Sequence, residues 1–497
     1  MPRIPEIEDS ALFVESVLIG GRWQAAASGA TLDVADPATG LVIGTVPSCD
    51  AADAGAAIDA ASAALAGWKR RTADERATIL ERWHDLMLAA APDLARIMTA
   101  EQGKPLAEAE GEIRYAASFV KWFAAEGRRV SGHDIPAPTP DRRILVTKEP
   151  VGVCAIITPW NFPAAMITRK IAPALAAGCT VVVKPSELTP FSALALVALA
   201  ERAGVPAGVV NIITGLPEGV GGVLTASPAV RKLSFTGSTR VGALLMRQSS
   251  DTLKRLSLEL GGNAPFIVFD DADIELAVAG AMISKFRNAG QTCVCANRIL
   301  VQDGIHDRFV TRLGEAVRAL KVGDGRWNGT TIGPLINEAA TAKVAAHVDD
   351  ALARGATIVA TPADAARGAC FSSPVLLTGA TPDMRLASEE TFGPVAPVFR
   401  FRDEEEAVML ANATPFGLAS YFYTDDLHRA WRVGEALEFG MVALNTGAIA
   451  MEMAPFGGIK ASGLGREGGR EGIEEYLELK AFHWGGLKLN NREREQA

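Results

Sequence analysis

The sequence predicts an α/β protein built from two parallel-sheet domains and a projecting β arm. After residue 150, continuously apolar strands alternate with helical segments at a short period, which indicates a parallel sheet covered by helices on both faces. A second alternating block, from residue 264 to about residue 440, predicts a second sheet. Segment 134–148 has three prolines before an alternating tail, which is typical of an arm that leaves the main body.

The N-terminal region changes from strands to helices near residue 51. Short strands with Gly-rich turns are expected at 16–19 and 32–36, followed by an alanine-rich helical region from 51 to about 129. Within that region, apolar residues between Ile113 and Phe123 recur at helical spacing, so one face of a helix is predicted to be buried.

The first alternating block and the C-terminus complete the expected elements. A further strand at 473–482 is expected to pair with the arm. In the block itself, strands are predicted at 151–158, 180–184, 209–213 and 232–236, and helices at 164–177, at 191–203 and from about 238.

Composition excludes several classes of function. The 497 residues carry a net charge of −9, which argues against a nucleic-acid binder held by phosphate contacts. The longest apolar stretches, about nine residues, are too short to span a membrane, and the N-terminus lacks the basic start and apolar stretch of a signal peptide. Six dispersed cysteines form neither a disulfide framework nor a metal-ligand pattern. We therefore expect a cytoplasmic protein with no membrane, nucleic-acid or metal partner.

Two segments at strand ends suit a nucleotide, although the Gly-x-Gly-x-x-Gly fingerprint is absent. In segment 235–242, Gly237 and Gly242 follow a strand, and the next helix could hold a phosphate on its backbone amides; a plain tight turn explains the glycines equally well. Lys184 and Glu187 lie at the carboxyl end of another strand, where open α/β sheets bind ligands. Glu187 could accept from ribose hydroxyls and repel a 2′-phosphate, or could simply start a helix.

Three further residues are candidates for covalent chemistry. Cys293, followed closely by Cys295, is either a reactive thiol or one of two buried structural thiols. Glu259 ends an apolar strand before two glycines, where a buried carboxylate must be partnered or functional. Asn161 follows a strand end and could hold an oxyanion or cap a helix before Pro163.

Together these segments resemble the NAD(P)-dependent aldehyde dehydrogenase superfamily over nearly the whole chain. The matching motifs, in family order and spacing, are Pro-Trp-Asn-Phe-Pro (159–163), Lys-Pro-Ser-Glu (184–187), Phe-Thr-Gly-Ser (235–238), Leu-Glu-Leu-Gly-Gly (258–262), Gly-Gln-Thr-Cys (290–293), Glu-Thr-Phe-Gly-Pro (390–394) and Pro-Phe-Gly-Gly (455–458).

The resemblance implies a non-standard Rossmann cofactor domain, a catalytic domain and an oligomerisation arm, in a homodimer or homotetramer. The implied ranges are 1–129 and 150–260 for the cofactor domain, 130–149 for the arm, 261–462 for the catalytic domain, and 463–497 for a C-terminal segment that joins the arm. The implied catalytic residues are the nucleophile Cys293, the base Glu259 and the oxyanion donor Asn161. The implied cofactor-binding residues are Trp160, Lys184, Ser186, Glu187, Gly237, Ser238, Leu260, Glu390 and Phe392.

The chemistry that follows is oxidation of an aldehyde through a cysteine adduct. A thiolate adds to the carbonyl, hydride leaves to the nicotinamide, and the base activates a water that hydrolyses the thioester. Because a free thiol has a pKa near ~8.5, the site is expected to favour the thiolate, for example through a helix N-terminus or the cationic nicotinamide. NAD is the expected cofactor because of Glu187, with NADP the alternative. Cys295 is a candidate redox partner of Cys293 or a space-filling thiol.

Longer segments resemble the succinate-semialdehyde dehydrogenase branch. There, Arg169 and Arg287 are implied to bind the distal carboxylate of the substrate, unless they form structural ion pairs. Ala450 stands where the branch usually has a serine, which fits a more apolar pocket and a longer substrate such as glutarate semialdehyde. A general aldehyde dehydrogenase, a coenzyme A-acylating enzyme and a non-catalytic relative are the alternatives; the presence of Cys293, Glu259 and Asn161 counts against the last two.

Overall fold

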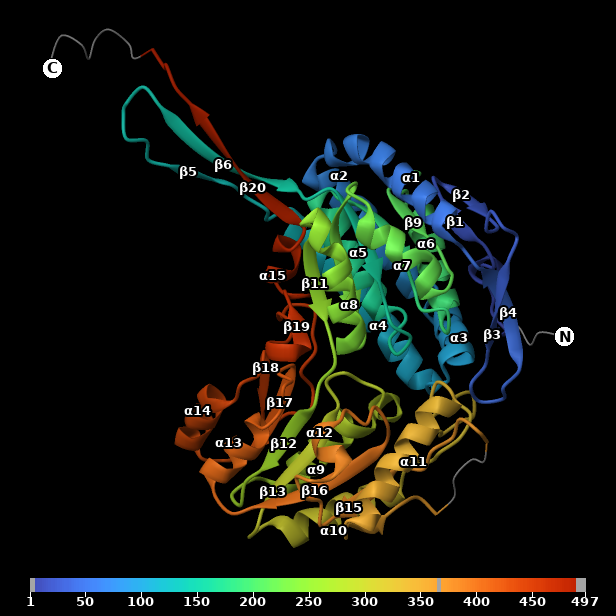
Figure 1. Ribbon diagram of the computed structural model, residues 1–497, viewed down its shortest axis with the longest axis vertical. Helices are drawn as coiled ribbons and strands as arrows, with labels where there is room; N and C mark the ends of the chain where they lie inside the picture. Colours follow the sequence, from blue (N-terminus) through green and yellow to red (C-terminus); the bar gives the residue numbers. More distant parts are fainter. Residues whose placement is uncertain (1–4, 364–367, 489–497) are drawn as a thin grey trace.

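Two sheets and a projecting arm organise the chain, as Figure 1 shows. The computed structural model describes residues 5–363 and 368–488. One sheet lies with the N-terminal helices, the other lies in the opposite lobe, and the arm extends away from both (Figure 1). The predicted α/β class with two parallel sheets is confirmed.

The first sheet has eight strands in the order β19-β11-β10-β7-β8-β9-β1-β2, and its central strands β11 to β9 run parallel. The central strand Thr180–Lys184 is buried along its whole length, because helices cover both faces. The strands are β1 (Val17–Ile19), β2 (Arg22–Gln24), β7 (Val153–Ile157), β8 (Thr180–Lys184), β9 (Val210–Ile212), β10 (Val230–Thr236), β11 (Arg255–Glu259) and β19 (Gly463–Leu464). The helices are α1 (Ala51–Lys69), α2 (Ala73–Ala89), α3 (Ala91–Gln102), α4 (Leu106–Gly127), α5 (Ala165–Ala177), α6 (Pro190–Arg202), α7 (Pro217–Ala226) and α8 (Thr239–Ser249), and β3 (Thr31–Ala35) and β4 (Val42–Pro47) form a separate hairpin.

The second sheet has seven strands in the order β14-β15-β16-β13-β12-β17-β18, all parallel except β14. It comprises β12 (Ala264–Val268), β13 (Ala296–Gln302), β14 (Thr357–Ala360), β15 (Val375–Thr378), β16 (Val395–Phe401), β17 (Ala419–Tyr423) and β18 (Met441–Leu444). Its helices are α9 (Ile274–Phe286), α10 (His306–Arg318), α11 (Glu338–Ala353), α12 (Arg385–Ser388), α13 (Glu404–Asn412) and α14 (Leu427–Ala436).

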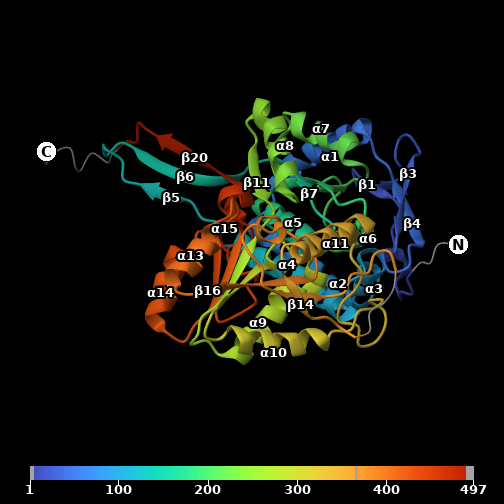
Figure 2. The same cartoon turned by 60° about the horizontal axis from the view of Figure 1, so that its bottom comes forward.

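The arm is a three-stranded antiparallel sheet of β5 (His133–Ile135), β6 (Arg143–Pro150) and β20 (Leu477–Trp484). The strand β20 pairs with β6 along its whole length, and the three strands stay together and clear of the body in both views (Figures 1 and 2). The expected C-terminal strand begins later than predicted, because Glu471–Glu474 form a helical turn, α15. The end of the predicted C-terminal segment, 489–497, lies outside the described residues.

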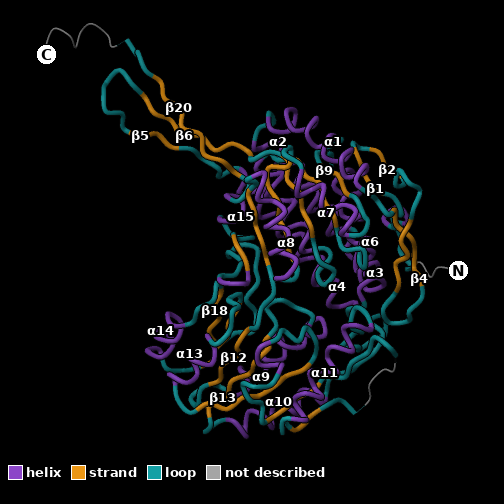
Figure 3. The backbone as a smooth tube through the Cα atoms, in the orientation of Figure 1, coloured by secondary structure: helices purple, strands orange, loops and turns teal. Residues whose placement is uncertain are grey.

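The strand register places the predicted motifs at one edge of the first sheet. Lys184 is aligned with Ile157 on β7, Ile157 with Phe235 on β10, and Thr236 with Glu259 on β11. Because these strands are parallel, the segments that follow them all emerge at the same edge, where open sheets bind ligands. Loops fill the region between the two lobes, as the tube in Figure 3 shows.

Candidate active site

A cavity of about 280 Å³ lies between the carboxyl edge of the first sheet and loops of the second lobe. It brings together segments that are more than 200 residues apart in the chain, such as Asn161 and Glu390. Predicted site residues that line it are Trp160, Asn161, Gly237, Ser238, Leu260, Cys293, Glu390 and Phe392. The other predicted residues, Lys184, Ser186, Glu187, Glu259, Arg169, Arg287 and Cys295, lie outside this lining.

Cys293 is the half-buried thiol in the loop before β13. Burial raises the pKa of Cys293 to about 12; the guanidinium of Arg169 lowers it, and the carboxyl groups of Glu390 and Glu259 raise it. In the chain alone this shift favours the protonated thiol, so the thiolate that the site is expected to favour would need a further source of positive charge, such as the cationic nicotinamide. The physical reason is desolvation, which a single nearby guanidinium does not offset.

Asn161 is buried beside the cysteine loop. Its Nδ2 donates to the carbonyl of Gln291 at 2.9 Å, which leaves the second N–H of the amide for another acceptor. Its Oδ1 has no hydrogen-bond partner among the described residues. Buried polar atoms without partners are uncommon, and at the edge of a cavity they indicate a place for a ligand.

Glu259 belongs to a buried cluster of charges that the sequence analysis did not predict. Burial raises the pKa of Glu259 well above its ordinary value, and the nearby carboxylate of Glu467 raises it further, while neighbouring cations lower it. Glu467 forms close ion pairs with Arg169 and Lys170, which hold its own pKa below the ordinary value although burial alone would raise it. Glu259 Oε2 makes no hydrogen bond to any described residue, so it is free to bind water or a ligand atom.

A sequence signal for this cluster did exist. Arg169 and Lys170 are consecutive cations in the helix α5, whose residues are buried throughout, and buried charges are tolerated when they are paired. Their partner Glu467 lies about 300 residues away, in a segment without a recognisable motif. The pairing therefore required the tertiary structure.

The segments expected to hold a nucleotide have suitable geometry. Buried Lys184 contacts the carboxylate of the half-buried Glu187 at 3.1 Å, at the end of β8. Ser238 caps the helix α8, and the rings of Trp160 and Phe392 meet edge to face with centroids 5.6 Å apart. Nearby, the hydroxyl of Ser186 accepts from the backbone N–H of Leu188 at 3.2 Å, and the side chain of Leu260 is buried against Gly242.

Glu390 and the glycine beside it shape the floor of the cavity. Glu390 accepts from the backbone N–H of Gly262 at 3.2 Å, and burial raises its pKa to about 7. A Cβ on Gly261 would lie 3.1 Å from Glu390 Oε2, so this glycine keeps the floor open. Sequence reasoning missed Lys343, which lines the cavity and donates to the carbonyl of Glu390 at 2.5 Å.

The two candidate substrate arginines have different environments. Arg169 is buried, paired with Glu467, and stacked 4.2 Å from the ring centroid of Phe456. Arg287 is exposed and lies over the ring of Phe162, 4.9 Å from its centroid. Within residues 5–363 and 368–488, no carboxylate forms an ion pair with Arg287. Ala450 is half-buried in the loop after β18.

Cys295 is buried and is a free thiol, like Cys293. Its Sγ accepts a hydrogen bond at 3.3 Å from Nζ of Lys285, which is a buried lysine of the helix α9. Burial raises the pKa of Cys295, and Lys285 opposes that shift.

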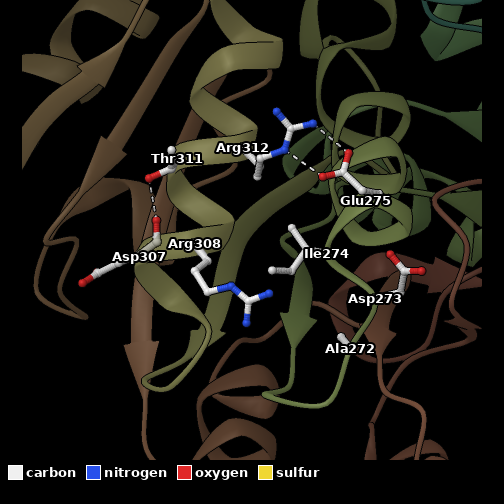
Figure 4. Close-up of a pocket in the computed structure, with 8 residues that line it drawn as sticks. All are labelled: Ala272, Asp273, Ile274, Glu275, Asp307, Arg308, Thr311 and Arg312. Atoms are coloured by element: carbon white, nitrogen blue, oxygen red, sulfur yellow. Dashed lines mark hydrogen bonds and ion pairs between the residues drawn. The ribbon is translucent and has the colours of Figure 1, made fainter.

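A larger surface hollow of about 710 Å³ is lined by residues at the starts of α9 and α10 (Figure 4). Two of its side chains are engaged with each other: Arg312 forms a two-pronged ion pair with Glu275, as the dashed lines show. It contains none of the predicted site residues. No cluster of metal-binding side chains occurs among the residues that the structure describes.

Comparison with known proteins assigns the family. A family model described as the aldehyde dehydrogenase family matches residues 23–482. The chain belongs to the aldehyde dehydrogenase family. It is therefore an NAD(P)-dependent aldehyde dehydrogenase with the fold of that family, and aldehydes are its class of substrate.

Individual relatives of this aldehyde dehydrogenase are close. A succinate-semialdehyde dehydrogenase [NADP(+)] from Escherichia coli is 59% identical over 96% of this chain and 98% of its own. A glutarate-semialdehyde dehydrogenase from Pseudomonas aeruginosa is 56% identical over 97% of this chain and 100% of its own. The crystal structure of succinate-semialdehyde dehydrogenase from Burkholderia pseudomallei superposes with a TM-score of 0.95 at 59% identity, covering 97% of this chain and 100% of the other. In the described part of this aldehyde dehydrogenase, no helix is long and apolar enough to cross a membrane.

Proposed function

We propose that this aldehyde dehydrogenase oxidises a short aldehyde with a terminal carboxylate, succinate semialdehyde first, to the dicarboxylate. The observation that supports this most directly is Arg287, an exposed guanidinium without a carboxylate partner among the described residues, in the segment that leads to Cys293. A free guanidinium can pair both oxygens of a carboxylate. Relatives named for succinate and glutarate semialdehyde agree with this class of substrate.

The catalytic roles follow from the site. Cys293 Sγ gives its proton to solvent and adds as the thiolate to the aldehyde carbon, and the resulting oxyanion accepts from Asn161 Nδ2 and from the backbone N–H of Cys293. When bound, NAD(P)+ supplies the hydride acceptor. The thioester left on Cys293 is hydrolysed when Glu259 takes a proton from water, which yields the carboxylic acid and restores the thiol. The unpartnered Oε2 of Glu259 and its raised pKa fit a general base.

The residues around the cavity fit a nicotinamide dinucleotide. Lys184, Ser186 and Glu187 would hold the adenosine ribose. Glu390 would hold the nicotinamide ribose, and the remaining lining residues, Trp160, Gly237, Ser238, Leu260 and Phe392, would enclose the cofactor. We propose NAD as the preferred cofactor, because the Glu187 carboxylate would accept from a 2′-hydroxyl and repel a 2′-phosphate.

Glutarate semialdehyde is the second candidate, and the half-buried Ala450 favours it. A methyl group in place of a hydroxyl removes one hydrogen-bond donor for a carboxylate and leaves a more apolar pocket. We therefore expect Ala450→Ser to shift the ratio of kcat/KM values toward succinate semialdehyde.

The test is kcat/KM for succinate semialdehyde, glutarate semialdehyde and butanal in the wild type, in Arg287→Ala and in Arg169→Ala. A hydrogen bond to a charged group contributes about 1.5–3 kcal/mol, so Arg287→Ala should lower kcat/KM roughly 10- to 150-fold for the semialdehydes and spare butanal. Arg169→Ala is expected to lower kcat/KM for all three substrates if the pairing of Arg169 with Glu467 supports the site. It is expected to lower kcat/KM for the semialdehydes alone if Arg169 binds the carboxylate of the substrate. Equal use of butanal by the wild type would refute the proposed substrate class.

We also propose that the protein is a homodimer or homotetramer of the cytoplasm. Apolar side chains exposed on the arm support an oligomer, and six free cysteines support a reducing compartment.

A further inference from the structure

Asn288 occupies an unusual place between the helix α9 and Cys293. It lies in the 3-10 turn Arg287–Gly290, it is 2% exposed, and its backbone is left-handed, with φ 52° and ψ 37°. Asparagine tolerates this conformation better than most residues, yet the conformation still costs free energy that surrounding contacts must supply. The mechanism proposed above gives Asn288 no part.

The side chain of Asn288 joins the oxyanion donor to the nucleophile loop. Its Nδ2 donates to the carbonyl of Asn161 at 2.9 Å and to the carbonyl of Gln291 at 3.3 Å. The same Gln291 carbonyl accepts from Asn161 Nδ2 at 2.9 Å. These bonds close a ring in which Asn161 and the residue two positions before Cys293 are held by one amide.

The ring is anchored from the N-terminal helices. Gln102, at the end of α3, donates from Nε2 to Asn288 Oδ1 at 3.0 Å, and Glu108 of α4 accepts from the backbone N–H of Asn288 at 2.9 Å. The carbonyl of Asn288 accepts from the backbone N–H of Gln291 at 3.0 Å and from its Nε2 at 3.1 Å. Every polar atom of Asn288 is thus bonded inside the protein, which leaves none for a substrate.

A second support reaches Asn161 from Lys104. This buried lysine donates to the carbonyl of Asn161 at 2.9 Å and forms a close ion pair with Glu112. The other oxygen of Glu112 accepts from the backbone N–H groups of Ala164 and Ala165, which start the helix α5. The Asn161 peptide is therefore held by two donors, of which only Asn288 also contacts the cysteine loop.

We propose that Asn288 is a positioning residue that fixes the Asn161 amide relative to Cys293, so that the oxyanion forms within reach of its donor. This rests on the roles proposed for Asn161 and Cys293. A displacement of about 1 Å is enough to weaken such stabilisation, because donors must meet the oxyanion at hydrogen-bond distance.

The test is a double-mutant cycle read by the pre-steady-state burst of NADH. Asn288→Gly keeps the left-handed backbone accessible and removes only the side chain. Loss of one oxyanion donor lowers kcat by about 100- to 1000-fold. Because Asn288→Gly displaces the donor without removing it, we expect this variant to slow the burst by roughly 10- to 100-fold. In the Asn161→Ala background, Asn288→Gly should slow the burst by less than about 3-fold, because the amide to be positioned is gone. The KM for NAD and the rate of Cys293 alkylation by iodoacetamide should stay within about 2-fold.

Two variants separate positioning from stability. Asn211 of the strand β9 is equally buried and makes three hydrogen bonds in the first sheet, so Asn211→Gly should lower the Tm without slowing the burst. If Asn288→Gly does not fold, Asn288→Asp replaces it, because the carboxylate keeps the acceptor for Gln102 and loses both donations.

The outcomes distinguish the inference from its premise. If Asn161→Ala leaves the burst unchanged, the proposed role of Asn161 fails. If Asn161→Ala slows the burst, and Asn288→Gly slows it by the same factor in that background as in the wild type, the positioning role of Asn288 is overturned. That role is also overturned if Asn288→Gly does not slow the burst of the wild type.

Discussion

At the residue scale, desolvation governs the reactivity of Cys293. Because burial raises its pKa to about 12, the thiolate fraction should still be rising at a pH where an ordinary thiol is already ionised. We expect the rate of alkylation by iodoacetamide, without cofactor, to increase about tenfold per pH unit up to about pH 10. Peptide mass spectrometry measures it, and half-exposed Cys370 in the same digest is the internal reference. A plateau below about pH 9 would show that the free site stabilises the thiolate after all.

Glu187 is the residue expected to select the cofactor. Its side chain is 31% exposed and its only ion-pair partner among the described residues is Lys184, so the carboxylate is open to a ribose. We expect a higher kcat/KM with NAD than with NADP. Glu187→Ser should lower the ratio of kcat/KM with NAD to kcat/KM with NADP, because it removes the charge that repels a 2′-phosphate. Steady-state kinetics with both cofactors decide this; a preference for NADP in the wild type contradicts it.

Cys295 is proposed as a redox partner of Cys293. A disulfide across one intervening residue requires the loop to change conformation, and Cys295 must also leave its hydrogen bond to Lys285. Peroxide should inactivate the enzyme, and dithiothreitol should restore it. Cys295→Ala should lose most of this recovery, whereas Cys370→Ala should keep it. Equal recovery in Cys295→Ala would instead assign Cys295 a space-filling role.

At the element scale, the turn between β11 and β12 sets the position of the cysteine loop. A Cβ on Gly262 would lie 2.5 Å from the backbone oxygen of Cys293, so a side chain there must push the loop away. We expect Gly262→Ala to lower kcat by at least about tenfold, since a misplaced nucleophile loses much of its rate. Cofactor affinity, measured by fluorescence titration, should change little.

The matched control for this turn is Gly222→Ala in the helix α7. A Cβ there meets nothing within 4 Å, and alanine in a helix is more favourable than glycine by roughly 0.5–1 kcal/mol. Full activity with an unchanged or slightly raised Tm is expected. Unimpaired turnover in Gly262→Ala would mean that the loop accommodates the side chain.

At the scale of the whole molecule, the arm of the single chain exposes apolar side chains to solvent. Leu479, Phe482 and Trp484 of β20 are each at least half exposed, which is costly for an isolated monomer. We expect the wild type to have a mass by light scattering that is a multiple of 52.2 kDa, and Phe482→Glu with Trp484→Glu to reduce it. Leu253→Asn, which changes an exposed leucine in a left-handed position far along the chain, should keep the oligomer. A monomeric wild type would refute the proposed assembly.

The sequence alone determined the fold class and most of the cavity. Buried parallel strands are apolar throughout, so strands such as Thr180–Lys184 were predicted with their observed bounds. Motifs directly after such strands must share one sheet edge, which is why Trp160 and Gly237 proved to line one cavity; Cys293, in the loop before β13, reaches that cavity from the other lobe. The strand expected from residue 473 begins only at Leu477, because the residues up to Glu474 form a helical turn that the mixed apolar and charged pattern there did not reveal.

Only the tertiary structure decided which buried charges and amides meet. The pairing of Arg169 and Lys170 with Glu467, and the ring that joins Asn288, Asn161 and Gln291, link segments far apart in the chain. Local patterning records which face of an element is buried, whereas a hydrogen bond between distant loops depends on how whole domains pack. Desolvation is likewise a property of the assembled site, and for that reason the raised pKa of Cys293 could not be read from its motif.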